Sequence, residues 1–199
     1  MSQPRSSRRG RASLAALLVL GLTPAARAQV SVTPGLVVRL QVGDQSTELQ
    51  LSRDAIQGRD LWLRRTEAGL VGRLHGKRVN VGWGDGPVEG HVGEAPVRLT
   101  VQPRSAHPGV TLEGAFAGWE TSFGVSPVGI SGAVGGCNYS LPHAANRYEG
   151  WRTCQASNLG RGPVPVRLEL PVGQLALGET ETAVLLSLLL SDVTLPPPP

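Results

Sequence analysis

The sequence has little of what marks an anchored or membrane-spanning protein. It contains two cysteines, one methionine, and aromatic residues at 4% of its 199 positions. Neither cysteine lies near the N-terminus, so we expect no lipid anchor at a cleavage-site cysteine. After the N-terminal segment no apolar run reaches the roughly 18 residues of a membrane-spanning helix, so no transmembrane segment is expected there. Strand-like runs are also shorter than the roughly 9–11 residues of an outer-membrane barrel strand, which counts against that class.

Recognisable catalytic and metal-binding motifs are lacking as well. The four histidines form no H-x-x-x-H or H-x-E pattern, so no metal and no cofactor are predicted. Residues 129–132 do not match G-x-S-x-G, and no nucleophile elbow occurs elsewhere. We therefore expect a protein that is not an enzyme. A hydrolase with an unrecognised pair of carboxylates is the least favoured alternative, because the 15 acidic residues are scattered.

What the chain does have is an N-terminal segment typical of export. Residues 1–28 contain arginines at 5, 8, 9 and 11, an apolar stretch over 14–22, and small residues at 26 and 28. This order of a basic, an apolar and a small-residue part predicts a signal peptide cleaved after Ala28. The protein is then exported to the periplasm, the cell surface or the exterior. Arg8 and Arg9 leave a twin-arginine route open beside the general one.

Removing that segment also removes the apparent basic charge. Five of the 19 Lys+Arg and none of the 15 Asp+Glu lie before Gln29, so 14 bases remain against 15 acids. Nucleic-acid binding needs a surplus of bases gathered on one surface. No nucleic-acid partner is therefore predicted.

The remaining chain is predicted to be one β-rich domain over residues 29–195, followed by a proline tail over 196–199. Apolar and polar residues alternate with a period of two over 38–42, 97–102 and 164–170, as expected for half-buried strands. The high glycine and proline content suits a turn-rich all-β chain. We predict an all-β fold of repeated antiparallel hairpins that forms a sandwich or a partly closed barrel, with one C-terminal helix.

Two segments carry this prediction in detail. An apolar-x-Gly pattern recurs at 70–72, 88–90, 112–114 and 130–132, and we interpret residues 69–141 as hairpin repeats. The glycine should lie on the inward face, leaving room for a bulge or for a large opposing side chain. Residues 179–191 begin with acidic residues and continue as a leucine-rich run, which predicts a helix buried against the β layers or a partner.

The candidate site lies between the two cysteines. In an exported chain, Cys137 and Cys154 are predicted to form a disulfide that holds the intervening residues as a loop. The candidate binding residues are polar and aromatic residues of this loop and one tryptophan in a glycine-rich turn: Tyr139, Tyr148, Trp151, Arg152 and Trp83. The structural alternative is that the loop aromatics pack on the domain. We expect most of the four tryptophans to fill core space opposite glycines.

These observations favour an exported, non-catalytic protein of the cell envelope or secreted fraction that binds a protein or glycan partner. A structural assembly subunit that docks through the helix at 179–191 or through an exposed strand edge is the main alternative.

Overall fold

The computed structural model describes residues 36–104, 108–155, 162–171 and 177–191. All of them belong to one compact unit, Val32–Pro199. The predicted signal peptide at 1–28 and the proline tail at 196–199 lie outside the described residues.

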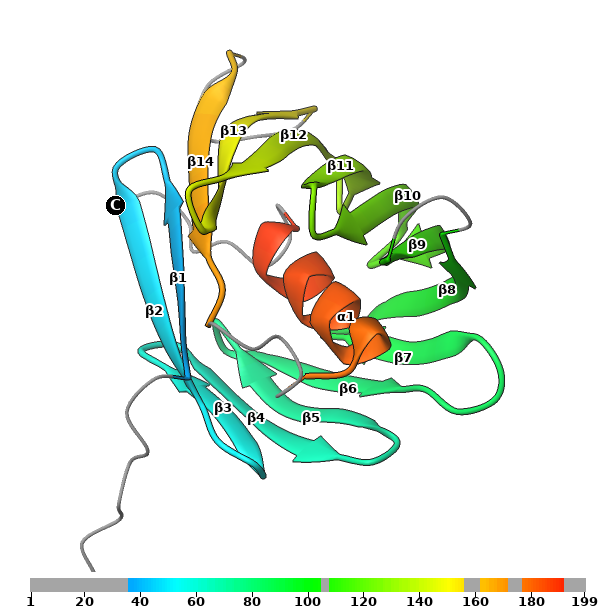
Figure 1. Ribbon diagram of the computed structural model, residues 1–199. Coiled ribbons are helices and arrows are strands. Elements are labelled where there is room, and N and C mark those ends of the chain that lie inside the picture. The colour runs from blue at the N-terminus through cyan, green and yellow to red at the C-terminus, as the bar shows by residue number, and fades with distance from the viewer. Residues whose placement is uncertain (1–35, 105–107, 156–161, 172–176, 192–199) are drawn as a thin grey trace, which may run out of the picture. The chain divides into compact units, whose positions relative to one another are not determined.

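The described residues form fourteen antiparallel strands and one helix (Figure 1). The elements are β1 (Val37–Val42), β2 (Gln45–Leu51), β3 (Ala55–Gly58), β4 (Leu61–Thr66), β5 (Gly69–Leu74), β6 (Lys77–Gly82), β7 (Val88–Val92), β8 (Ala95–Pro103), β9 (Val110–Phe116), β10 (Trp119–Ser126), β11 (Gly129–Val134), β12 (Cys137–Ala144), β13 (Arg147–Cys154), β14 (Val164–Glu169) and α1 (Glu179–Leu190). Each strand pairs with its neighbours in sequence, and β1 also pairs with β14, with Leu40 opposite Leu168. The predicted all-β class and C-terminal helix are confirmed, and the barrel is fully closed.

The alternation of the sequence determines which face of each strand points inward. In β1, Val38, Leu40 and Val42 are buried, whereas Arg39 and Gln41 are exposed. Outward-facing charges pair across the strands: Arg39 contacts Glu48 on β2 at 3.3 Å. Neighbouring residues of a strand point to opposite faces, so this pattern produces an apolar lumen and a polar outer surface.

Helix α1 lies inside the ring of strands (Figure 1), and every residue from Glu181 to Leu190 is buried. The sequence predicts the helix to within one residue of its C-terminal end and predicts its burial. A barrel of this many strands is too wide for its own side chains to fill, and an apolar helix supplies the missing volume. Ser187 is accommodated because its hydroxyl donates to the Ala183 carbonyl at 2.8 Å.

A largely buried ion pair holds the N-terminal part of α1 to the barrel wall. Both oxygens of Glu181 accept hydrogen bonds from Arg65 on β4, at 2.6 Å from Nε and 2.9 Å from Nη2. Arg65 also donates to the Ser52 carbonyl at 2.5 Å. Two parallel hydrogen bonds between a guanidinium group and a carboxylate are among the strongest contacts between side chains. They therefore define the position of the helix end.

The glycines of the apolar-x-Gly pattern lie where neighbouring strands approach most closely. Gly72, Gly90, Gly114 and Gly132 lie on β5, β7, β9 and β11, each the first strand of a hairpin. A Cβ atom at any of them would collide with a backbone carbonyl oxygen of the preceding strand. The space is therefore needed for close backbone approach, rather than for a large side chain from an opposing layer. Gly150 on β13 makes the same approach, although it lies outside the predicted repeats at 69–141.

Candidate binding site

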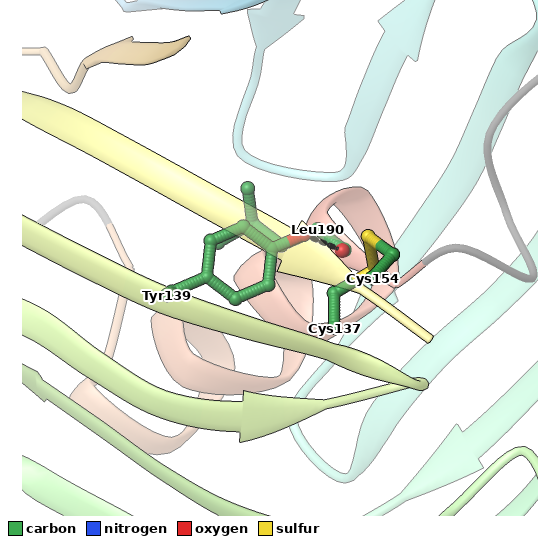
Figure 2. Close-up of a disulfide and its surroundings, with 4 residues drawn as sticks. All are labelled: Cys137, Tyr139, Cys154 and Leu190. Carbon is green, nitrogen blue, oxygen red and sulfur yellow. Dashed lines mark hydrogen bonds between the residues drawn. A yellow bond between two sulfur atoms is a disulfide. The ribbon is translucent and has the colours of Figure 1, made fainter. Parts of the chain in front are cut away.

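The segment between the two cysteines is a hairpin and not an irregular loop. It consists of β12 and β13, joined by a tight turn in which Ala145 and Asn146 have φ values of 50° and 64°. Two consecutive positive φ values characterise the two-residue turns that match the twist of paired strands. Cys137 and Cys154 are directly opposite each other, and their sulfur atoms lie 2.02 Å apart, at disulfide distance (Figure 2).

Strand alternation separates the predicted binding residues. Tyr139, Tyr148 and Arg152 point into the barrel and are buried, whereas Trp151 points outward and is 57% exposed. The expectation that they share one exposed loop surface is therefore wrong. Tyr148 and Arg152 are four residues apart and lie on one strand face, while Trp151 is an odd number of residues from both. The alternation was present in the sequence, but the interpretation of a loop left it unused.

The two tyrosines connect inner elements of the barrel. The Tyr139 hydroxyl donates to the Leu190 carbonyl at the C-terminal end of α1 (Figure 2), and its ring packs edge-on against Phe123. The Tyr148 hydroxyl donates to the Ser126 carbonyl at 3.0 Å. Buried tyrosines with satisfied hydroxyl groups are part of the core. Replacing Tyr148 would thus disturb the fold, and it does not serve as a test of binding.

The tryptophans also depart from expectation, since none of the four is buried. Trp62 on β4 is 51% exposed on the outer face, and Trp83 and Trp119 are half-buried. In β4 the buried Leu61 and Leu63 take the inward positions, so Trp62 between them must point outward. Spacing relative to the aliphatic residues thus decides the direction of Trp62, whatever its size.

Trp151 borders a groove of about 460 Å³ on the outer face of β13, β14 and β1. Two cross-strand rows form it. In one row Glu149, Arg167 and Gln41 lie side by side, and in the next Trp151 lies opposite Pro165. Successive outward rows are about 7 Å apart along a strand, because each residue advances about 3.4 Å. An exposed aromatic ring therefore lies one row from three side chains that can hydrogen bond.

The charges of this groove are fixed by a small network. Glu149 accepts hydrogen bonds from Arg167 at 3.0 Å and from Arg147 at 2.8 Å. These two bonds, that of Arg167 first, hold the pKa of Glu149 below its ordinary value. The same contact with Glu149 raises the pKa of Arg167. The groove therefore presents the ionised carboxylate of Glu149 and the guanidinium group of Arg167 at neutral pH, and Arg147 contacts the same carboxylate from beside the groove.

Two further hollows accompany this groove. Trp83 lines one of about 690 Å³ with Arg53, Asp54, Glu67 and the first turn of α1. A second, mainly apolar hollow of about 240 Å³ is lined by Tyr148 together with Val110, Val125 and Leu177. Trp83 and Trp151 thus belong to different hollows, and the predicted site residues divide into an inner set and two separate surface sets.

Within the described ranges no three His, Cys, Asp or Glu side chains gather in a way that could hold a metal ion. No helix in the described part of the chain is long and apolar enough to cross a membrane. Comparison with known proteins finds no matching family model, no matching curated sequence and no matching solved structure.

Proposed function

We propose that this is an exported, non-catalytic binding protein that recognises a glycan at the Trp151 groove. The observation that carries the proposal is an exposed tryptophan beside an ordered polar row. The C–H face of a sugar ring is apolar and packs on an indole ring, while its hydroxyls need donors and acceptors close by. Trp151 supplies the first contact, and Glu149, Arg167 and Gln41 supply the second.

The barrel supports this function by its rigidity. The groove spans three strands of a closed sheet, so the backbone positions from which its side chains project are set without a ligand. A pre-organised site loses less conformational entropy on binding than a flexible loop does. The cysteine pair at disulfide distance and the signal-like N-terminal segment support placing the protein in the periplasm, at the cell surface or outside the cell.

Docking through the helix or through a strand edge is not proposed. The leucines of α1 are buried against the barrel of the same chain, so they are not available to a partner. Among the described strands each has a neighbour on both sides, since β1 pairs with β14. The unpaired edge that an added strand would need is therefore lacking there.

The test uses the mature protein on a panel of neutral and acidic oligosaccharides, followed by calorimetric titration of those that bind. Trp151→Ala should weaken binding at least tenfold, which corresponds to about 1.4 kcal/mol. Trp62→Ala is the matched control, because this tryptophan is similarly exposed but lies outside the groove. Failure of every oligosaccharide to bind, or equal affinities for Trp151→Ala and the unaltered protein, would refute the proposal.

Trp83→Ala separates the two tryptophan-lined hollows. It should leave the affinity unchanged, because Trp83 lies at the hollow beside the first turn of α1. Loss of binding in this variant, with full binding retained in Trp151→Ala, would assign the site to the other hollow and contradict the proposal as stated.

A further inference from the structure

Arg152 is the most anomalous polar group in the described part of the chain. Its side chain is 1% exposed, and Nε, Nη1 and Nη2 are all buried without a hydrogen-bond partner. A guanidinium group keeps its charge in proteins and carries five N–H donors. An unpaired charge in a protein interior is strongly destabilising, and buried polar groups in native structures nearly always have partners.

The described surroundings of Arg152 offer it partial negative charge but no anion. On the inner face Arg152 lies between Tyr139 of β12 and Val164 of β14. Tyr139 contacts the Leu190 carbonyl, so the C-terminal end of α1 lies next to this row. The carbonyl groups at a helix C-terminus carry partial negative charge, which favours a nearby cation without neutralising it.

The described carboxylates do not fill this role. Glu181 is the one buried carboxylate among the described residues, and it lies at the opposite end of α1. Both of its oxygens already accept hydrogen bonds from Arg65. Glu149 is on the same strand as Arg152 but faces outward, where it pairs with Arg147 and Arg167.

We propose that the barrel interior binds an oxyanion, a carboxylate or phosphate group, that accepts hydrogen bonds from Arg152. The planar fork of a guanidinium matches two oxygens of such a group, which makes arginine the residue best suited to this ligand. This site lies on the inner face of β13, whereas the Trp151 groove lies on the outer face. Each proposal can therefore be tested independently of the other.

The experiment measures thermal unfolding of the mature protein in inorganic phosphate and, separately, in decanoate, against chloride at equal ionic strength. A ligand that binds the folded state raises the Tm in proportion to the logarithm of its concentration above Kd. We expect a rise of several degrees at millimolar concentration and a one-to-one adduct in the native mass spectrum. A response to phosphate indicates a free anion, and one to decanoate alone indicates the head group of an aliphatic acid.

Arg152→Met should abolish the response, because methionine keeps much of the volume and removes the charge. Arg98→Met is the matched control: Arg98 is exposed and pairs with Glu89, so this variant should respond like the unaltered protein. An equal response of Arg152→Met would overturn the proposal. If Arg152→Met does not fold, hydrogen exchange in the unaltered protein decides, since the anion should protect β12 and β13 and leave β4 and β5 unchanged.

The chain itself offers one competitor for the anion. Asp192 follows Ser191 in the sequence and lies outside the described residues. If its carboxylate neutralises Arg152, the unaltered protein should respond to neither anion, whereas Asp192→Asn should become responsive. That result would overturn the proposal of an external ligand. A response of the unaltered protein that persists in Asp192→Asn supports it.

Discussion

The two halves of the barrel hold the central helix by different means. On β1 to β8 the buried apolar side chains are all valine, leucine or isoleucine, and we call these strands the aliphatic half. On β9 to β14 the interior also holds Phe116, Phe123, Tyr139, Tyr148 and Arg152, and we call these strands the mixed half. The cysteine pair also belongs to the mixed half.

The comparison shows that burial of apolar side chains stabilises α1 in the barrel, whereas directional contacts determine its position. Aliphatic side chains contribute about 1.5–3 kcal/mol each when buried, but they tolerate many rotations of a leucine-rich helix. Directional contacts favour one of these rotations over the others. Arg65 and Glu181 supply such a contact at the N-terminal end of α1, and Tyr139 supplies another through the Leu190 carbonyl.

The largest effect is expected where both halves meet, on α1 itself. Leu186→Asp removes a fully buried side chain and places a carboxylate in the apolar lumen. The free energy of unfolding should fall by at least about 4 kcal/mol, measured by urea denaturation. Val128→Asp is the control, because Val128 is 62% exposed and its replacement should change stability by less than about 0.5 kcal/mol. Equal stabilities of the two variants would show that α1 is not part of the core.

The next effect tests the charged contact of the aliphatic half. Glu181→Gln removes the carboxylate charge from a largely buried contact with Arg65, which should cost about 3 kcal/mol. The double variant Arg65→Met, Glu181→Leu should recover much of this loss, because neither charge remains. Urea titrations of Arg65→Met, of Glu181→Leu and of the double variant give the coupling energy. A coupling near zero would mean that packing alone places the helix.

The cysteine pair tests the mixed half. Denatured, unreduced protein should take up no thiol-alkylating reagent. Replacing Cys137 and Cys154 by serine should cost about 3 kcal/mol, because the cross-link spans a sequence separation of 17 and restricts the unfolded chain. Hydrogen exchange should accelerate more in β12 and β13 than in β4 and β5 when the two cysteines are replaced. Uptake of two equivalents of reagent by the unreduced protein would contradict the disulfide.

The smallest effect is a pH dependence in the aliphatic half. Burial is the main cause that lowers the pKa of His75 below its ordinary value near 6.5, with Lys77 adding to it and Asp60 opposing it. As pH falls through about 6.5, the unfolded chain takes up this proton more readily than the folded one. Stability should therefore decrease from about pH 6.5 downward and level off below the folded pKa.

His75→Asn isolates this contribution, because asparagine tolerates the φ of 46° found at this turn. The difference in urea midpoint between the variant and the unaltered protein should change between pH 7.5 and 5.5. A difference independent of pH would show that His75 titrates alike in both states.

Much of the local structure follows from the sequence because it depends on near neighbours. Alternation identifies inward residues such as Leu40 and Leu99, and acidic residues before a leucine run locate α1. The same alternation over Tyr148, Trp151 and Arg152 also indicates which residues of the candidate site face inward and which face outward. This pattern is local, but it was not applied to residues 137–154 because they were predicted to form a loop.

By itself, then, the sequence determined the all-β class, the inward faces of the alternating strands outside residues 137–154, the helix and the cysteine pair, since each depends on residue spacing along a short stretch. Closure of the barrel depends on β1 meeting β14, and the Arg65–Glu181 contact joins residues 116 positions apart. The groove assembles Gln41 with Glu149 and Arg167 in the same way. The tertiary structure decided these because burial of α1 and completion of the hydrogen-bond ladder are properties of the whole chain, which no local pattern encodes.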